Sequence, residues 1–196
     1  MGLRQSQKSN RHERLLDMVS KDPFHTDEEL SEIFSVSIPT IRLDRIELNI
    51  PEMRERIKKL ASESHSKIRS MSSGDIVGQI IEIELNNSGV SILETDDSMV
   101  FEKTQVVRGQ FIYAFAESLA IAVINETAAL VGVANIKYKS PVYSGMRLIA
   151  YCELKEIRVI KGKRYLVWVR IFHKDAEVFR GKYILVSETR QFGEGV

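Results

Sequence analysis

Two groups of residues in this chain have types and spacings that could do chemistry. The first lies in the segment TDEELSEIFSVSIPTIRLDRIEL, residues 26–48. Helical spacing there predicts that Thr40, Arg42 and Arg45 point outward from one short helix that Ser37 begins. Arginine can bond the O6 and N7 atoms of guanine, and neighbouring side chains can bond phosphates. We therefore predict Ser37, Thr40, Arg42 and Arg45 as contacts to double-stranded DNA.

The second group lies in QVVRGQFIYAFAESLAIAVI, residues 105–124. Arg108 could hold a carboxylate or phosphate through two hydrogen bonds, helped by free N–H groups at the start of the helix that begins at Gly109. Glu117 is a lone charge in an apolar helix, so it needs a partner, a raised pKa or water. The alternatives are a surface arginine and a carboxylate on a wetter seam of the helix, such as a dimer interface.

The first group needs two short helices to position it. Thr26 followed by Glu29 is a capping box, which predicts a helix to about Phe34 with Leu30, Ile33 and Phe34 buried. Ser37 is a second N-cap, and Pro39 fits the first turn of a helix over about 38–48. Two helices joined by the short turn 35–37 have helix-turn-helix geometry, although an ordinary helical hairpin has the same spacing.

The segment 51–72 is predicted to begin with an amphipathic linker helix. Pro51 starts it, and apolar residues then recur at helical spacing from Met53 to Ala61. A solvated face and a face that lies near phosphates are equally compatible with its charges. The residues predicted to be exposed are Arg54, Arg56, Lys58 and Lys59.

From residue 73 the pattern changes to strands with period two. Five are predicted as an antiparallel meander: 80–85, 130–138, 148–160, 165–172 and 177–186. The helix 109–124 between the first two is apolar on almost every side, so its surroundings must bury it. A long sheet wrapped round one buried helix is the hotdog arrangement. The predicted fold class is α+β, with a helix-turn-helix domain (1–50), a linker helix (51–72) and a hotdog domain (73–190).

Composition excludes several classes of protein. The 196 residues carry 28 basic and 27 acidic side chains, so the chain is not a uniformly basic coat for nucleic acid or membrane. One cysteine excludes an intrachain disulfide and a cysteine-rich zinc site, and we expect no metal and no cofactor. The longest apolar run, residues 111–124, is too short to span a bilayer. We expect a cytoplasmic protein with no membrane partner.

The order of residues adds a resemblance. ELSEIFSVSIPTIRLDRIEL is similar to the EELAxxFxVSxxTIRRDLxxLE pattern of DeoR-type bacterial repressors. Over residues 12–187 the chain resembles the FapR family, bacterial repressors of fatty-acid and phospholipid synthesis genes. Its most specific blocks are residues 23–58, SILE (91–94) and VFEKTQVVRGQFIYAFAESLAIAVI (100–124).

The FapR resemblance implies a homodimer that binds an inverted-repeat operator and releases it when malonyl-CoA or a related acyl-CoA binds the hotdog domain. Arg108 then matches the arginine that pairs with the malonyl carboxylate, and Gly109 the glycine that leaves room for the acyl group. Phe111 and Leu130 match the lining of the ligand tunnel. Glu117 stands where the family has asparagine, and a carboxylate there would repel the ligand by about 4 kcal/mol at ~4 Å unless protonated or paired with Arg108.

Two other functions compete with this one. Hotdog thioesterases often place an acidic residue on the same helix, so Glu117 would favour an acyl-CoA thioesterase with an attached DNA-binding domain. No serine or histidine is suggestively spaced beside it, so we expect no catalytic residue and no enzyme. A DeoR-type repressor of sugar metabolism would carry an α/β effector domain, and the strands after residue 125 argue against that.

Overall fold

The computed structural model describes residues 3–159 and 162–187, with side chains from residue 7 onward, and divides the chain into two compact units. The N-terminal unit is Met1–Leu60 and the C-terminal unit is Ala61–Val196. The division falls inside helix α4 (Met53–His65), which lies within the segment 51–72 predicted to hold the linker helix.

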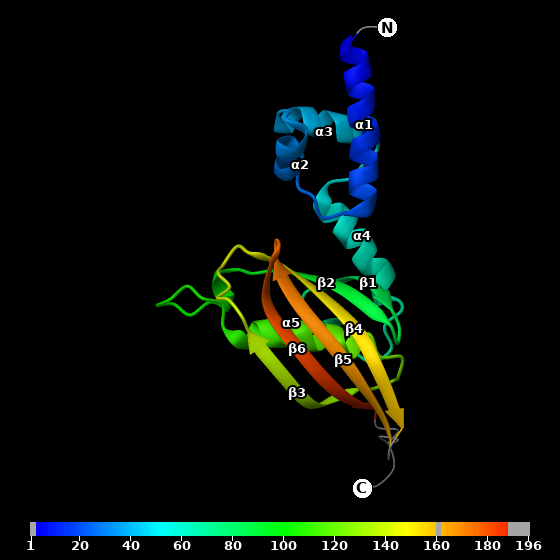
Figure 1. The fold of residues 1–196 in the computed structure, drawn as a ribbon, viewed down its shortest axis with the longest axis vertical. Coiled ribbons are helices and arrows are strands. Elements are labelled where there is room, and N and C mark those ends of the chain that lie inside the picture. The colour runs from blue at the N-terminus through cyan, green and yellow to red at the C-terminus, as the bar shows by residue number, and fades with distance from the viewer. Residues whose placement is uncertain (1–2, 160–161, 188–196) are drawn as a thin grey trace. The chain divides into compact units, whose positions relative to one another are not determined.

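The N-terminal unit consists of α1 (Leu3–Lys21), α2 (Asp27–Phe34), α3 (Ile38–Glu47) and the first part of α4 (Figure 1). The capping box is confirmed, because Thr26 Oγ1 accepts from the Glu29 N–H at 3.2 Å and Glu29 Oε2 accepts from the Thr26 N–H at 2.9 Å. Ser37 caps α3 by accepting from the Thr40 N–H. The two caps fix where α2 and α3 begin, and the turn 35–37 between them is as short as predicted.

A small apolar core joins these helices. The prediction that Ile33 is buried is wrong, because its side chain is 43% exposed. Helix α2 is only eight residues long, and Leu30 and Phe34, four residues apart, occupy its single inward face. The buried apolar residues of this core are Leu15, Val19, Leu30, Ile41 and Ile50.

Arg56 on α4 corrects a second expectation, because it is buried rather than on the exposed face. Its guanidinium donates to the backbone carbonyls of Pro23, Pro51 and His25. Burial lowers the pKa of Arg56. The side chain therefore ties the start of α4 to the loop between α1 and α2 instead of facing solvent.

The C-terminal unit is a six-stranded antiparallel sheet and one long helix, α5 (Gly109–Ala122). All five predicted strands are present, except that residue 160 of the third lies outside the described residues. The prediction missed β2, whose sequence SGVSILE begins with weak strand formers. The strands are β1 (Gln79–Glu84), β2 (Ser88–Glu94), β3 (Leu130–Tyr138), β4 (Arg147–Val159), β5 (Lys163–His173) and β6 (Ala176–Ser187).

The strand order β1-β2-β4-β5-β6-β3 is a meander only in part. Strands β4, β5 and β6 follow one another, but β3 pairs with β6 rather than with β4, and β1–β2 forms a hairpin beside β4. The predicted meander is therefore confirmed for β4, β5 and β6 but does not extend to β3. The consequence is that β3 forms one edge of the sheet, with its outer side unpaired among the described residues.

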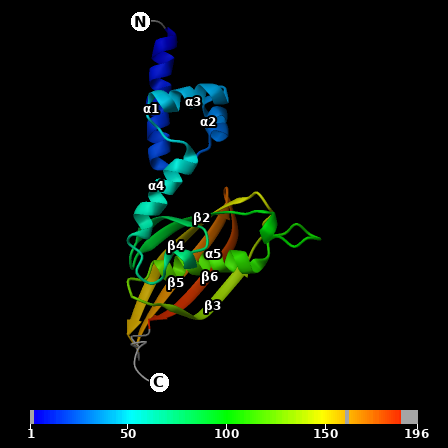
Figure 2. The same ribbon diagram turned by 180° about the vertical axis from the view of Figure 1, so that it is seen from behind.

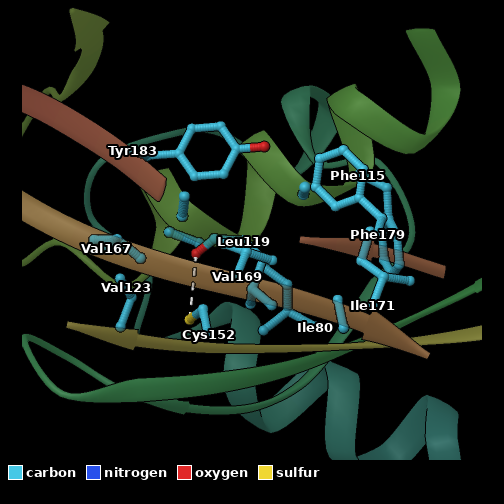
Figure 3. Close-up of a cluster of buried hydrophobic side chains, with 14 of the residues drawn as sticks. Ile80, Phe115, Leu119, Val123, Cys152, Val167, Val169, Ile171, Phe179 and Tyr183 are labelled. Atoms are coloured by element: carbon cyan, nitrogen blue, oxygen red, sulfur yellow. Dashed lines mark hydrogen bonds between the residues drawn. The ribbon is translucent and has the colours of Figure 1, made fainter. Parts of the chain in front are cut away.

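Helix α5 lies against one face of the curved sheet, as the views from both sides show (Figures 1 and 2). Phe115 and Leu119 are fully buried against strand residues, and Cys152 lies close beneath the helix, with Sγ 3.8 Å from the Leu119 carbonyl (Figure 3). The prediction that the sheet buries this helix is confirmed. No helix in the described part of the chain is long and apolar enough to cross a membrane.

Candidate functional site

Arg45 on α3 corrects the predicted DNA-contact group. We expected it to point outward, but it is only 4% exposed. Its guanidinium binds both carboxylate oxygens of Asp27 at 2.6 and 2.8 Å and donates to the Ile50 carbonyl at 3.1 Å. Hydrogen bonds from Arg45 lower the pKa of Asp27. Arg45 therefore holds α3 against the start of α2 and is not free to reach a base.

The other three predicted contacts lie on the exposed side of α3. Arg42 is exposed, and its Nε lies 3.4 Å from Asp27 Oδ2, so the pair is loose. The hydroxyls of Ser37 and Thr40 lie 2.9 Å apart at the first turn of the helix. Ser37 and Thr40 are therefore adjacent at the first turn of α3, whereas Arg42, two residues after Thr40, projects from another side of the helix. Each could contact phosphates or bases.

Sequence reasoning missed Asp44, which is buried on α3. It receives two hydrogen bonds from Arg11, at 2.6 and 3.1 Å, and lies 2.8 Å from His12 Nε2, both on α1. Burial alone would raise the pKa of Asp44, but these hydrogen bonds outweigh it and lower the pKa. The signal was available, since Asp44 and Arg45 lie three and four residues after buried Ile41, on the same helix face.

Arg108 in the C-terminal unit is the N-cap residue of α5. Its side chain donates to the backbone carbonyls of Ser98 and Met99, and its guanidinium carbon lies 4.8 Å from the centre of the Phe111 ring. No carboxylate of the described residues forms an ion pair with it. Because a guanidinium has five N–H donors, a ligand anion could still be bound by the remaining ones.

The space beside Gly109 is occupied by Tyr138 from the end of β3. A Cβ added at Gly109 would lie 3.0 Å from the Tyr138 hydroxyl, which donates to the Gly109 carbonyl at 2.9 Å. The glycine therefore lets this aromatic ring reach the start of α5. Room for an acyl group at this point requires Tyr138 to move.

A pocket of about 430 Å³ opens between the start of α5 and the end of β3. Sequence reasoning left open whether Tyr138 lines a tunnel or fills the core, and it missed Phe101 as a lining residue. The pocket wall is largely apolar, with Lys139 contributing a charge that is paired with Glu177 at 2.8 Å. Lining residues include Phe101, Val107, Gly109, Ile112, Tyr138 and Val142.

Glu117 is not part of the Arg108 group. Nine residues of helix separate them, about 13 Å along the axis. The hydrogen-bond partner of Glu117 is the hydroxyl of Tyr113, at 3.2 Å. The ring of Tyr183 lies 6.1 Å from that of Tyr113. The hydroxyl of Tyr183, a residue drawn in Figure 3, is buried and has no partner among the described residues. Pairing with Arg108, one of the two conditions that would remove the repulsion of a ligand carboxylate, is therefore not met.

Leu130, the fifth predicted ligand residue, is also distant from the pocket. It begins β3 and is 61% exposed, whereas Tyr138, which lines the pocket, ends the same strand. Eight residues of extended chain separate the two by about 26 Å. Of the five predicted ligand residues, only Arg108, Gly109 and Phe111 lie close together at the start of α5 within the described chain. In the described part of the chain no cluster of acidic, histidine or cysteine side chains could hold a metal.

Comparison with known structures agrees with the geometry of the C-terminal unit. An uncharacterised protein from Pyrococcus horikoshii is 27% identical over 62% of this chain and 92% of its own, with a TM-score of 0.56. A virulence protein from Campylobacter jejuni is 24% identical over 68% of this chain and 94% of its own, with a TM-score of 0.60. The unit is a helix enclosed by an antiparallel sheet, a fold shared with the PaaI protein of Escherichia coli (TM-score 0.50).

Curated relatives named as transcription factors match nearly the whole chain. A Thermoanaerobacter protein named Transcription factor FapR is 52% identical over 98% of this chain and 94% of its own length. The protein of the same name from Caldanaerobacter subterraneus is 50% identical over 94% of this chain and 91% of its own length. The one from Bacillus cereus is 41% identical over 96% of this chain and 95% of its own length. No family model matches the sequence. The chain belongs to the FapR family of transcription factors, and this sequence-based prediction is confirmed.

Proposed function

We propose that the chain is a repressor of lipid-synthesis genes whose N-terminal unit binds an operator and whose C-terminal unit binds malonyl-CoA or a related acyl-CoA. The position of Arg108 carries the proposal. It is a cation without a carboxylate partner among the described residues, at the N-cap of α5, next to an apolar pocket bordered by Val107 and Gly109. A ligand with an apolar arm that ends in a carboxylate matches this pair of features.

The α2–α3 pair is the proposed helix-turn-helix, with α3 in the major groove. Ser37, Thr40 and Arg42 support this role, because none of them belongs to the buried face of α3, which Ile41, Asp44 and Arg45 form. Arg45 supports it indirectly, since its ion pair with Asp27 fixes the angle between the two helices. A rigid helix pair presents its outer face to DNA at a low entropic cost.

A homodimer is proposed through the free edge of β3. This edge exposes Leu130, Val133 and Tyr138, and an unpaired apolar strand edge favours pairing with another strand. Antiparallel pairing of two β3 strands about Ala134 would place Leu130 of the partner subunit beside Tyr138. Because the β-bulge between Val131 and Val133 puts Leu130 and Tyr138 on opposite faces of β3, this pairing leaves the Leu130 side chain in the dimer surface and outside the pocket.

Release from DNA requires that the ligand binds one state of the dimer better than another. In the proposed cycle, the ligand stabilises a state in which the linker helices no longer hold two α3 helices at the spacing of an inverted repeat. Half-sites are then expected about one helical turn apart or a multiple of it.

The test is operator binding measured with and without malonyl-CoA, with acetyl-CoA as the control that lacks the terminal carboxylate. Arg108→Ala should leave DNA affinity unchanged and weaken the response to malonyl-CoA about tenfold or more, the value of a charge-assisted hydrogen-bond pair. Arg42→Ala should weaken DNA binding and leave ligand binding unchanged, so each variant is the control for the other. Full release of the Arg108→Ala variant by malonyl-CoA would contradict the role of Arg108.

The thioesterase alternative depends on Glu117. Its contact with Tyr113 offers a carboxylate with a polar neighbour on α5, but His173 lies elsewhere, with its ring bound to the Arg147 carbonyl at 3.0 Å. The relatives compared above are named as transcription factors. We propose that no catalysis occurs, and release of free thiol from malonyl-CoA or longer acyl-CoAs at about 1 per second or faster would contradict this.

A further inference from the structure

The exposed face of α3 has an apolar centre. Leu43 and Ile46 are 61% and 69% exposed, among the highest values for large apolar side chains in the described chain. With Pro39 they lie at spacings of three, four and seven residues, which places them along one helix stripe. Exposure of these apolar side chains to water does not stabilise the folded unit, so the stripe indicates a binding surface.

The charged residues of α3 lie to the sides of this stripe. On one side Arg42 contacts Asp27, and on the other Glu47 forms an ion pair with Lys8 at 2.6 Å. Arg45 is buried in its pair with Asp27. The part of α3 that faces outward most directly therefore offers methyl groups rather than hydrogen-bond donors.

Double-stranded DNA offers one apolar group in its major groove, the C5-methyl group of thymine, which aliphatic side chains contact. We propose that Leu43 and Ile46 are specificity-determining residues that pack against thymine methyl groups in each operator half-site. This inference rests on the proposed function, because it requires α3 to enter the major groove. It adds which bases the helix recognises: each operator half-site should carry thymines opposite the middle of α3.

The position of the polar residues agrees with this division of roles. Ser37 and Thr40 lie at the N-terminal end of α3, where hydroxyls and helix N–H groups suit phosphates. Leu43 and Ile46 lie one and two turns further along the helix, where side chains would reach base edges. Contacts that position the helix and contacts that read the sequence then come from different turns.

The experiment begins with selection of binding sites for the full-length protein from a random pool of DNA duplexes. In the selected duplex, each half-site thymine is then replaced by uracil, which removes only the methyl group and keeps the hydrogen-bonding edge. Binding of the protein and of Leu43→Ala and Ile46→Ala to both duplexes completes a double-mutant cycle. Leu16→Ala, which shortens an exposed apolar side chain on α1, is the matched control.

We expect uracil to weaken binding of the unmodified protein about fourfold for each methyl group contacted, the value of one buried methylene. The Leu43→Ala and Ile46→Ala variants should bind the thymine duplex less tightly and lose little more with uracil, whereas Leu16→Ala should respond to uracil as the unmodified protein does. Thermal unfolding should be unchanged, because both side chains are exposed.

Three results would overturn the inference. Uracil duplexes bound as tightly as thymine duplexes would exclude methyl recognition while leaving operator binding intact. If Leu43→Ala and Ile46→Ala weakened binding to the thymine and uracil duplexes equally, the stripe would make another contact with DNA. If either variant changed the oligomeric state of the protein, the stripe would instead bind a protein partner. Failure to select any duplex would instead contradict the proposed function itself.

Discussion

The two units bury different polar side chains. In the described part of the N-terminal unit three charged side chains are buried: Asp44, Arg45 and Arg56. In the described part of the C-terminal unit no charged side chain is buried, and the buried polar ones are serines, a threonine and tyrosines. The N-terminal unit has few apolar residues to bury, and a unit of about 60 residues gains little from a hydrophobic core. Its helices are instead fixed by hydrogen-bonded charges. The C-terminal unit has a whole apolar helix to bury, and its sheet encloses that helix with almost no charge inside.

The comparison teaches that the same residue type has opposite roles in the two units. Arg45 forms part of the packed interior of the N-terminal unit, while Arg108 lies partly exposed at the start of α5. Conversely, Leu43 and Ile46 are exposed on α3, while Phe115 and Leu119 on α5 are fully buried. Residue type alone therefore does not identify the binding residues of this protein.

The largest effect is expected in the core of the C-terminal unit. Phe115→Ala should lower the free energy of unfolding by about 3–5 kcal/mol, because it leaves a cavity between α5 and the sheet. Urea unfolding followed by the fluorescence of Trp168, the single tryptophan of the chain, measures this. Phe101→Ala, which removes an exposed ring, is the control, and an equal loss in both variants would contradict the enclosed core.

The N-terminal unit should instead be most sensitive to a charge. Asp27→Ala should lower its free energy of unfolding by about 3 kcal/mol, because it leaves the buried Arg45 guanidinium without its partner. Far-UV circular dichroism follows the helices of this unit during urea unfolding. Asp17→Ala removes an exposed ion pair with Lys21 and should cost less than about 1 kcal/mol. Similar losses of unfolding free energy in Asp27→Ala and Asp17→Ala would contradict the view that buried charges stabilise the N-terminal unit.

Acid should weaken the N-terminal unit through two of its carboxylates. The folded-state pKa values of Asp27 and Asp44 are lowered, so their contribution to stability is present above the unfolded value of about 3.9 and is lost as pH falls through the folded values. Helix content at fixed urea should therefore fall below about pH 4. Asp44→Asn should be less stable at pH 7 and should show a flatter pH dependence, and an unchanged slope would contradict this assignment.

The smallest effect is expected from Glu117→Asn. At about 13 Å from Arg108 along α5, the carboxylate is too distant to repel a ligand carboxylate bound there. The affinities for malonyl-CoA and acetyl-CoA should change by the same factor, within about threefold, in calorimetric titrations. A selective gain for malonyl-CoA would show that the ligand carboxylate lies near Glu117 and would reassign the site.

Much of the fold was predictable because local signals specified it. The capping box at Thr26, the N-cap at Ser37 and the apolar run of α5 each depend on residues close in the sequence. Strand β2 was missed because serine and glycine weaken its pattern, and β3 was misplaced because strand order depends on pairing between distant segments. The predicted outward direction of Arg45 failed because Asp27, its partner, lies 18 residues away.

The sequence by itself determined the family, the starts of α2 and α3 and the presence of one enclosed helix, because these follow from short-range spacing and from residue order. Only the tertiary structure decided which charges are buried, which apolar side chains remain exposed on α3, and which residues surround the pocket at Arg108. Those properties arise from contacts between segments distant in the sequence, and the free energy of each contact depends on the partner that the fold supplies.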